Sequence, residues 1–352
     1  MNCLPVVICG GEGRRLWPVS NTKLPKQFAP LFMRSLVSMA MTRAENFGTP
    51  WILTCERWRQ QTLADLVPRG FLESHIICEP EARGTGPAIA FLTWQFCQMG
   101  LQNQSIVLMA VDQIVEDVVK LKDAIEIGVA ASQCEEKIVL LGAKPKYPSS
   151  GFGYIQFDSP SGTNGPTSTV YPVARFIEKP SPSIAMELFA SQTCFWNAGV
   201  FIFTAATMQS TLRRFWPQLA GQMDTYFGDG EKNPKLYSKC ESLSIDRGVF
   251  EKADNLLCVA CDPGWTDVGC WDDIAAAVDN VSGVSVNSLA KVESVASENC
   301  FVQTTQGKKV ILLGVNDLIV VDSGDGLLIL KKGESQKLAQ TATVQQSQGV
   351  DE

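Results

Sequence analysis

The first residues whose types and spacing suggest chemistry follow an apolar run near the start of the chain, residues 4–9. The sequence there reads Gly-Gly-Glu-Gly-Arg-Arg-Leu-Trp-Pro from Gly10, and Pro-Lys-Gln-Phe follows from Pro25. Glycines at such a turn let backbone N–H groups approach phosphate oxygens, and neighbouring cations neutralise the phosphate charge. We therefore predict a phosphate-binding loop, with a Gly-rich surface turn and solvated arginines as the alternative. Four cations and one anion occur in this stretch: Arg14, Arg15, Lys23 and Lys26, and Glu12.

Two better-known phosphate motifs are excluded by spacing. No Gly-Lys-Ser/Thr follows the glycines, so the segment is not a Walker A loop, and the third glycine of a dinucleotide fingerprint is missing. A nicotinamide-dependent oxidoreductase is therefore a remote interpretation. The single histidine, His75, precedes an apolar pair, and no Gly-x-Ser-x-Gly elbow occurs, which disfavours a serine hydrolase. Cys258 and Cys261 form a lone Cys-x-x-Cys, which is too small a ligand set for zinc.

The scaffold that must position this loop is predicted by alternating apolar runs and helical patterns. Strands are expected at 4–9, 51–55, 75–78, 106–110, 138–142, 154–157, 176–177, 200–203 and 256–260, and helices at 35–46, 57–66, 87–99, 118–132 and 182–190. Strands interleaved with helices predict an α/β fold with a Rossmann-like, doubly wound, mostly parallel sheet. Ligands of such sheets bind outside the carboxyl ends of the strands. Gly10 and Asp112 each follow a predicted strand, so both are expected near the carboxyl ends of the strands, where the ligand would bind.

The pattern changes near Val281, where short runs rich in Val, Leu, Ile, Ser and Gly replace the helical periodicity. We predict one α/β domain over residues 1–280 and a small β-rich C-terminal domain over residues 281–340. The second domain is expected to resemble a few coils of a β-helix, closed by a short helix near 335–339. Residues 341–352 are rich in Gln, Thr and Ser and are predicted to be disordered.

The composition is that of a globular protein, with 45% hydrophobic and 19% charged residues. The net charge of −7, without a basic stripe, argues against general nucleic-acid binding. No apolar run is long enough for a membrane span, and the N-terminus lacks a secretory signal. Twelve scattered cysteines, several inside apolar runs, indicate buried reduced thiols. We therefore expect a cytoplasmic protein.

Several blocks of the sequence, in order, resemble the sugar-nucleotide pyrophosphorylases. The N-terminal segment is similar to their pattern GGxGxRLxPxSxxxxPKQF, whose PKQF ending is similar to the mannose-1-phosphate guanylyltransferase branch. Later blocks resemble EPxxRNTAPAIA, FxEKP, WNSGMF, SIDYAVMEK and WSDVGSW of that branch, and they begin at Glu79, Phe176, Trp196, Ser244 and Trp265. The resemblance runs from residue 4 to about residue 275, with a weaker echo at 317–328. Blocks in the right order are more specific than any one of them.

The resemblance implies a reaction. A sugar 1-phosphate oxygen would attack the α-phosphorus of a nucleoside triphosphate, with GTP and mannose 1-phosphate as the expected substrates and GDP-mannose and pyrophosphate as products. Positioning and charge neutralisation dominate such a reaction. Two alternatives stay open: the same chemistry on another sugar 1-phosphate or base, and a non-catalytic relative that senses sugar nucleotides. A homodimer is also left open, with the β-rich segment as its candidate surface.

The resemblance also implies roles for individual residues. Arg15, Lys26 and Lys179 form the expected catalytic set, and the sugar is expected to contact Gly153, Glu178 and Asn197. Asp112 and Asp267 match the family's metal-binding aspartates, and a Mg²⁺ that bridges phosphates needs only one or two protein carboxylates. The nucleotide is expected to contact seven residues: Gly10, Gly11, Gly13, Arg14, Arg83, Thr85 and Pro87.

Three positions depart from the family's pattern. Gln113 stands where the family has histidine in Pro-x-Asp-His, Gly84 stands where it has asparagine in Asn-Thr-Ala, and Arg247 stands where a tyrosine is common. These loops would bear on base and sugar recognition, so the departures concern specificity and not the reaction class. Bifunctional relatives carry a further isomerase domain of the cupin kind; its histidines are missing from this sequence, and no isomerase activity is expected.

Overall fold

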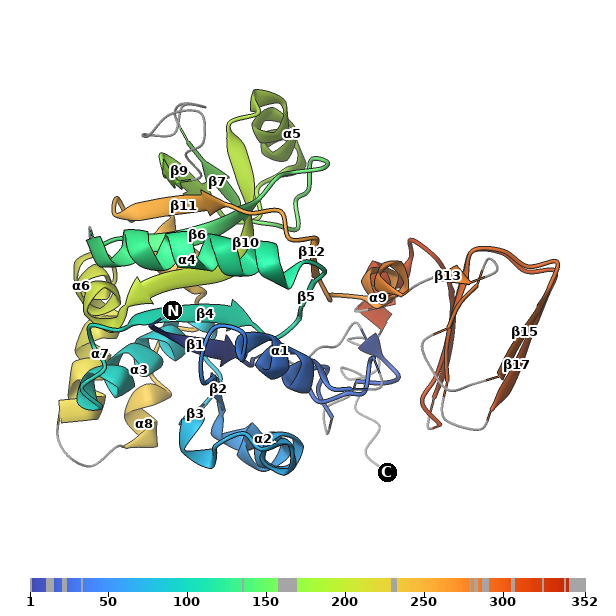
Figure 1. Cartoon of the computed structure of the whole chain (residues 1–352), viewed down its shortest axis with the longest axis horizontal. Coiled ribbons are helices and arrows are strands. Elements are labelled where there is room, and N and C mark those ends of the chain that lie inside the picture. The colour runs from blue at the N-terminus through green and yellow to red at the C-terminus, as the bar shows by residue number, and fades with distance from the viewer. Residues whose placement is uncertain are drawn as a thin grey trace. The chain divides into compact units, whose positions relative to one another are not determined.

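The computed structural model describes residues 2–10, 16–20, 24–32, 34–134, 136–157, 170–228, 233–278, 280–281, 284–286, 291–304, 308–324, 326–338 and 340–341. The chain divides into two compact units (Figure 1). Unit 1 comprises Met1–Gly10, Met41–Ala110 and Val115–Trp265, and unit 2 comprises Gly11–Ala40, Val111–Ile114 and Thr266–Glu352. Across the described ranges, no helix combines the length and the apolar character needed to cross a membrane. The domain boundary expected at residue 280 stays a prediction.

A mixed sheet forms the centre of unit 1. Its main path runs β3 (Ile76–Glu79), β2 (Trp51–Cys55), β1 (Cys3–Ile8), β4 (Ser105–Ala110), β10 (Cys194–Thr204), β6 (Ile138–Ala143), β11 (Leu256–Ala260) and β8 (Val170–Pro172). Strand β7 (Tyr154–Gln156) pairs with β10 and with β9 (Arg175–Ile177). The first four strands of the path are parallel, as are β6 and β11, which confirms the predicted α/β class. Strand β10 runs antiparallel between β4 and β6, which the strand and helix pattern did not predict.

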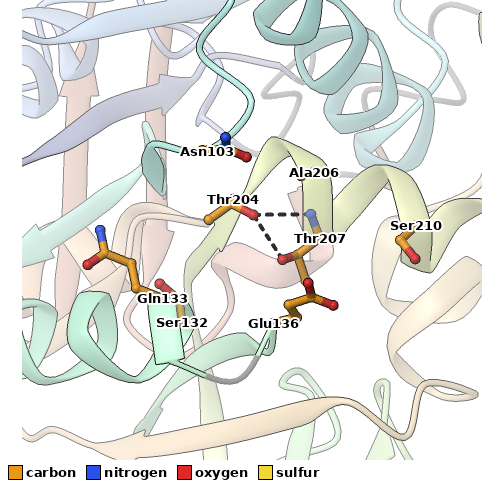
Figure 2. A pocket seen from close by; sticks show the side chains of 8 residues that line it. All are labelled: Asn103, Ser132, Gln133, Glu136, Thr204, Ala206, Thr207 and Ser210. Atoms are coloured by element: carbon orange, nitrogen blue, oxygen red, sulfur yellow. Dashed lines mark hydrogen bonds between the residues drawn. The ribbon is translucent and has the colours of Figure 1, made fainter.

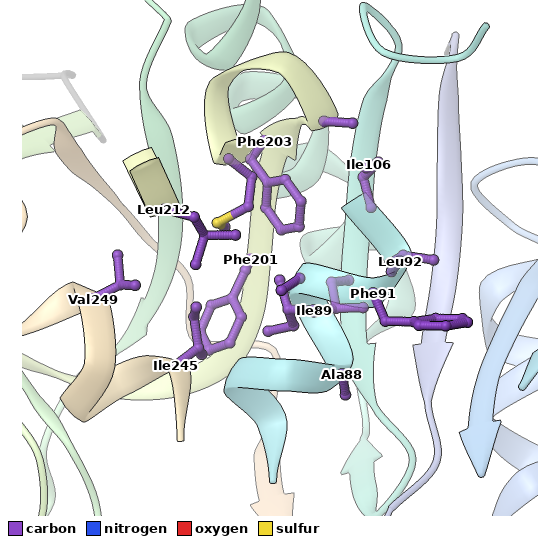
Figure 3. Close-up of a cluster of buried hydrophobic side chains, with 14 of the residues drawn as sticks. Ala88, Ile89, Phe91, Leu92, Ile106, Phe201, Phe203, Leu212, Ile245 and Val249 are labelled. Carbon is purple, nitrogen blue, oxygen red and sulfur yellow. The ribbon is translucent and has the colours of Figure 1, made fainter. Parts of the chain in front are cut away.

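Helices cover both faces of this sheet, because its central strands are apolar on both sides. Alternation along β10 sends Phe201 and Phe203 toward α3 (Thr85–Gln98) and α6 (Ala205–Phe215), as Figure 3 shows. Ile202 between them faces Gly128 of α4 (Val118–Cys134) on the other side. Helix α7 (Pro217–Gly228) packs on α3 and α6. The remaining helices are α1 (Leu36–Ala44), α2 (Arg59–Leu66), α5 (Pro182–Ser191) and α8 (Pro234–Tyr237), and a π-helix spans Asp246–Phe250.

His75 and Cys258, for which the sequence disfavoured a catalytic or zinc-binding role, are both packed against other residues of unit 1. His75 stacks on Trp51, with 3.9 Å between the ring centroids and 8° between the planes. Cys258 is fully buried on β11. The structure describes the side chains of eleven of the twelve cysteines, and all eleven are free thiols.

Unit 2 contains α9 (Trp271–Ala277) and a β-rich region of the expected kind. Parallel strands β14 (Val284–Val286), β16 (Cys300–Gln303) and β18 (Leu318–Asp322) stack in register, and β15 (Lys291–Val295) and β17 (Lys309–Leu313) form a second parallel pair. Strands β13 (Asn280–Val281) and β19 (Leu327–Lys331) border the first stack. The interior is apolar, as stacked coils require, and the expected short helix is a 3₁₀ turn at Ser335–Lys337.

Candidate active site

Gly10 is the described residue of the predicted phosphate loop. The backbone N–H of Cys9 still donates to Leu53 at 2.8 Å, so Gly10 is the first residue beyond the strand pairing. Gly10 is exposed, and a Cβ at this position would meet nothing within 4 Å apart from its chain neighbours. Its backbone can therefore be approached closely by a ligand. Gly11, Gly13, Arg14 and Arg15 lie outside the described residues, and their roles stay predictions.

Unit 2 brings together Lys26, Asp112 and Asp267, which are far apart in the sequence. The ammonium of Lys26 donates to Asp112 Oδ2 at 2.5 Å and to the carbonyl oxygen of Val268 at 3.1 Å. The N–H of Val268 donates to the Asp112 carbonyl at 2.7 Å, where β12 (Trp265–Asp267) pairs with β5 (Gln113–Val115). This backbone pairing places Asp267 beside Asp112. The Lys26 side chain is 11% exposed and that of Asp112 24%, so the ion pair is largely shielded from solvent.

The two aspartates suit a divalent cation that keeps most of its own ligands. Magnesium binds through one or two carboxylates and completes its octahedron with water and phosphate oxygens. In the described part of the chain, no group of three or more His, Cys, Asp or Glu side chains could hold a metal ion by itself. Asp112 and Asp267 supply the oxygen ligands that such a hard cation prefers. A divalent-cation site with two carboxylate ligands therefore fits these residues.

Unit 1 gathers the three residues expected to bind the sugar: Gly153, Glu178 and Asn197. The N–H of Asn197 donates to the Gly153 carbonyl at 2.8 Å. A Cβ on Gly153 would lie 2.6 Å from Glu178 Oε2 and 3.4 Å from Asn197 Cβ. The three residues therefore lie in contact, and a side chain at residue 153 would force the Glu178 carboxylate to move. They come from the loop before β7, the end of β9, and β10.

Two backbone irregularities aim these side chains. Lys179 has φ +48°, in the left-handed region that residues other than glycine rarely adopt. Its ammonium lies 3.7 Å from Glu178 Oε1, although neighbouring residues of a regular strand point to opposite faces. The pairing of β10 with β6 shifts between Asn197 and Phe201, and the N–H of Gly199 donates to Asn197 Oδ1 at 3.0 Å. Bulges and strained residues of this kind concentrate at functional sites.

Two carboxyl groups have a raised pKa: Glu178, which lies with Gly153 and Asn197 in the group expected to bind the sugar (below, the sugar cluster), and Asp246 beside it. Burial, and after it the negative charge of Asp246, raises the pKa of Glu178 from 4.5 to about 7, while Lys179 and Arg247 act in the opposite direction. Burial also raises the pKa of Asp246. A carboxyl group accepts hydrogen bonds when ionised and can donate one when protonated. Glu178 can therefore pair with sugar hydroxyls in either state.

The residues expected along the nucleoside lie at the start of α3. Gly84 has φ +87°, and the helix begins at Thr85, two residues before the predicted start at Pro87. Pro87 is buried in the first turn, where a missing N–H removes no helical hydrogen bond. Thr85 Oγ1 accepts the N–H of Ile245 at 3.0 Å, and Arg83 pairs with Glu81 at 3.2 Å. Their contacts with a nucleoside stay predictions.

Sequence reasoning missed two carboxyl groups beside these residues. Asp246 Oδ1 accepts a hydrogen bond from Asn197 Nδ2 at 3.2 Å. Glu79, buried at the end of β3, accepts one from the hydroxyl of Tyr237, which is fully buried on α8. Burial raises the pKa of Glu79 to about 7, and the Tyr237 hydrogen bond opposes this. The block from Ser244 was a signal for Asp246, whereas nothing in the sequence joins Glu79 to Tyr237.

A polar hollow of about 460 Å³ lies in unit 1 near the amino ends of β4 and β6 (Figure 2). It is thus at the end of these strands opposite to their carboxyl ends. Its lining contains hydroxyl and amide groups and one carboxylate but no lysine or arginine, so it does not suit a polyphosphate. Thr204 and Thr207 satisfy each other there, with 2.8 Å between their hydroxyl oxygens. The lining residues are Asn103, Ser132, Gln133, Glu136, Thr204, Ala206, Thr207 and Ser210.

Known proteins are similar to this chain over nearly its whole length, including both the sheet of unit 1 and the β-rich region of unit 2. Mannose-1-phosphate guanylyltransferase of Escherichia coli is 31% identical over 344 residues, covering 95% of this chain and 72% of that protein. Alginate biosynthesis protein AlgA of Pseudomonas fluorescens is 30% identical and covers 99% of this chain and 73% of that protein. The crystal structure of a Thermus thermophilus protein named as mannose-1-phosphate geranyltransferase superposes with a TM-score of 0.85 at 25% identity, over 99% of this chain and all of that one.

Two family descriptions match the chain in succession. Residues 291–341 match the MannoseP isomerase/GMP-like beta-helix domain, which agrees with the stacked parallel strands of unit 2. Residues 4–282 match the nucleotidyl transferase family, and this range includes every residue of the Lys26 and Glu178 clusters. With this match over most of its length, and with relatives at 30% identity or above, the chain belongs to the nucleotidyl transferase family.

Proposed function

We propose that the chain transfers GMP from GTP to mannose 1-phosphate, giving GDP-mannose and pyrophosphate. The observation that carries this proposal is the shielded Lys26–Asp112 pair, with Asp267 beside it in unit 2. A lysine next to two aspartates is what a transferred phosphoryl group and a divalent ion require. The names of the relatives from Escherichia coli and Klebsiella pneumoniae, at 31% and 30% identity, support the substrates.

In the proposed reaction, an oxygen of the sugar 1-phosphate forms a bond to the α-phosphorus of GTP. The bond from that phosphorus to the bridging oxygen of the β-phosphate breaks, and pyrophosphate leaves with the electron pair. The protein forms no covalent bond, so its work is positioning and charge neutralisation. Gly10, Gly11 and Gly13, with Arg14 and Arg15, would hold the triphosphate through backbone N–H groups and guanidinium groups.

Lys26 would contact the transferred phosphoryl group. An ammonium group has three donors, and two of those on Lys26 are used by Asp112 and Val268. The third would donate to a phosphate oxygen, and the ammonium would neutralise the charge that develops there. Lys179, whose side chain is exposed beside Glu178, would bind the phosphate of the sugar.

Members of the family generally use a divalent metal, and we propose Mg²⁺ for this chain, held by Asp112 and Asp267. When bound, it would neutralise the phosphate oxygens and orient them for transfer.

The sugar hydroxyls would be bound by Glu178 and Asn197, with the Gly153 backbone beside them. The contact between Gly153 and the Glu178 carboxyl supports a closely fitting polar pocket wall. Arg83, Thr85 and Pro87 would lie along the nucleoside. Gln113, Gly84 and Arg247 depart from the family pattern, and Arg247 is close enough to Glu178 to lower its pKa. This proximity makes another sugar 1-phosphate the second candidate substrate.

The test is pyrophosphate release by the purified chain with GTP, mannose 1-phosphate and Mg²⁺. A panel of the four nucleoside triphosphates against several hexose and heptose 1-phosphates accompanies it, with Asp112→Asn as the control for background hydrolysis. We expect the highest kcat/KM for GTP with mannose 1-phosphate. A higher value for another pair would replace the substrates but keep the reaction class. Nucleotide binding without release from any pair would indicate a sensor and refute the proposal.

We further propose that the chain works in the cytoplasm as a homodimer. Free thiols at all eleven cysteines whose side chains the structure describes support a reducing compartment. The pair β15–β17 exposes a row of apolar side chains, with Val295 47%, Ile311 58% and Leu313 67% exposed, which supports a contact surface there. Light scattering should give twice the chain mass, and Leu313→Lys should reduce it to one. Fractionation of cells that contain the tagged chain tests the compartment.

A further inference from the structure

Residues 243–251, here called the bridging segment, contact both groups of residues assigned to substrates in unit 1. On one side, its Leu243 carbonyl accepts the N–H of Gly86 at 3.1 Å, and its Ile245 N–H donates to Thr85 Oγ1 at 3.0 Å. On the other side, Asp246 accepts from Asn197 at 3.2 Å. The segment is therefore hydrogen-bonded both to the start of α3, where the nucleoside is expected, and to Asn197 of the sugar cluster.

The π-helical winding of the segment explains how it presents two carboxylates to the sugar cluster. The N–H of Glu251 donates to the Asp246 carbonyl at 2.9 Å, an i to i+5 bond that brings these residues close together. In an α-helix, residues five apart would point about 140° away from each other. Glu251 Oε1 accepts the backbone N–H of Glu178 at 3.0 Å, while Asp246 contacts Asn197. Single π-helical turns are frequent at functional sites.

The bridging segment is rigidly anchored. Ile245 and Val249 are fully buried, and Figure 3 shows both in the cluster that contains Phe201 of β10. A Cβ on Gly248 would lie 2.3 Å from Trp216, so the segment packs closely on that indole. Asp246 is thus held by a fixed backbone and not by a mobile loop.

Both ends of the Asn197 amide are engaged. Its Oδ1 accepts the Gly199 N–H at 3.0 Å, and its Nδ2 donates to Asp246. The Gly199 bond fixes which end of the amide is the donor, since a backbone N–H can only donate; Nδ2 is then the group that donates to Asp246. One Nδ2 proton and one Oδ1 lone pair remain for a ligand. Without Asp246, only the Gly199 bond would orient the amide.

We propose that Asp246 is a positioning residue for the sugar substrate: it holds the Asn197 amide in the orientation in which its free donor and acceptor meet the sugar hydroxyls. This inference rests on the proposed function, because it assumes that Asn197 contacts the sugar. Asp246 acts through Asn197 and needs no contact of its own with the substrate.

The first experiment compares Asp246→Ala and Asp246→Asn by steady-state kinetics. Asp246→Ala removes the acceptor and should raise KM for mannose 1-phosphate about tenfold, the scale of one hydrogen bond to a charged group. Asparagine keeps an acceptor oxygen, so Asp246→Asn should change this KM by less than about threefold. KM for GTP should stay within about twofold in both variants. Asp254→Ala is the matched control, because Asp254 pairs with Arg214 on the exposed surface.

Asp246→Ala in an Asn197→Ala background decides whether Asp246 acts through Asn197. Coupled residues are non-additive, so the second substitution should then change KM for mannose 1-phosphate by less than about twofold. A full further tenfold increase would overturn the proposal, as would an equal rise in both substrates' KM values, which would indicate a general structural defect. Equal effects of Asp246→Ala and Asp246→Asn would overturn it too.

A readout without substrate separates this proposal from the proposed function. The side-chain amide protons of Asn197, assigned by their loss in Asn197→Ala, can be followed by NMR with asparagine-selective labelling. One Nδ2 proton should exchange slowly in the unmodified chain and in Asp246→Asn, and fast in Asp246→Ala. Unchanged exchange in Asp246→Ala refutes the positioning role even if the chain is active. Inactivity of the unmodified chain with GTP and mannose 1-phosphate refutes the function, while the exchange rates still report whether Asp246 holds Asn197.

Discussion

Replacing Lys26 by methionine tests the phosphate site most directly. The change removes the ammonium but keeps an unbranched side chain of similar length. It leaves Asp112 Oδ2 and the Val268 carbonyl without the donor that now lies 2.5 and 3.1 Å away. Loss of a charge aimed at a transition state lowers turnover about a hundredfold or more. We expect Lys26→Met to lower kcat for pyrophosphate release by at least that factor.

The same substitution should destabilise the fold in a way that a divalent ion reverses. Removing one partner of a buried ion pair costs about 3–5 kcal/mol, and an exposed pair contributes at most about 1 kcal/mol. Asp112 is 24% exposed and Lys26 11%, so an intermediate loss of about 2 kcal/mol is expected. Excess Mg²⁺ should restore much of this stability, because Asp112 would regain a neighbouring positive charge.

The assay is urea unfolding in EDTA and in excess Mg²⁺, beside the steady-state kinetics. Lys120→Met is the matched control, since Lys120 also pairs with an aspartate, Asp117 at 3.3 Å, but on the exposed surface. The control should change stability by less than about 1 kcal/mol and leave turnover unchanged. Turnover of Lys26→Met within tenfold of the unmodified chain would remove Lys26 from the phosphate site. An equal stability loss in both variants would show that the Asp112 pair has no special environment.

Three further predictions concern unit 1. Gly153→Ala should raise KM for the sugar phosphate at least about tenfold, because the new Cβ would lie 2.6 Å from Glu178 Oε2. Gly151→Ala is the control: its Cβ would meet only a hydroxyl at 3.4 Å, so this KM should stay unchanged. The pKa of Glu178 rises from 4.5 to about 7 on folding, so between these pH values the folded chain binds more protons than the unfolded chain and loses stability as pH rises. Glu178→Gln should therefore flatten this part of the pH profile of the unfolding free energy. An unchanged slope would contradict the raised pKa of Glu178. Tyr237→Phe removes the hydrogen bond that lowers the pKa of Glu79, so it should reduce the free energy of unfolding in urea by about 1–3 kcal/mol. The loss should be larger at about pH 8 than at about pH 6, because the hydrogen bond stabilises the ionised carboxylate. A loss independent of pH would contradict the contact between Tyr237 and Glu79.

Much of the unit 1 fold could be predicted from the sequence because its central strands are buried on both faces. Strands such as β1, β4 and β6 are continuous apolar runs, and this signal depends only on neighbouring residues. Strands β16 and β18 of unit 2 carry a similar local signal, whereas β15 is polar and mostly exposed. Strand β10 was predicted only at 200–203, although it begins at Cys194, because Asn197 and Gly199 interrupt its apolar run at the bulge. Helix α6 was missed although its buried residues Ala205, Met208 and Leu212 recur at a helical spacing, so the signal for it was present in the sequence.

The site could be predicted to the level of residue types in ordered blocks, and no further. Those blocks indicated Lys26, Asp112, Glu178 and Asn197, and the structure brings Lys26 to Asp112 and Glu178 to Asn197 by way of Gly153. The sequence holds the chemistry of each block, because side-chain type decides which group can bind a phosphate, a metal or a hydroxyl.

Only the tertiary structure decided which groups meet and how they point. The partnership of Asn197 with Asp246 depends on a bulge in one strand and a π-helical turn 49 residues later. The left-handed Lys179 and the pKa of Glu178 are likewise set by surroundings from several elements. Side-chain type is a local property and can be read from the sequence, whereas contact, burial and charge are sums over neighbours that the folded chain alone assembles.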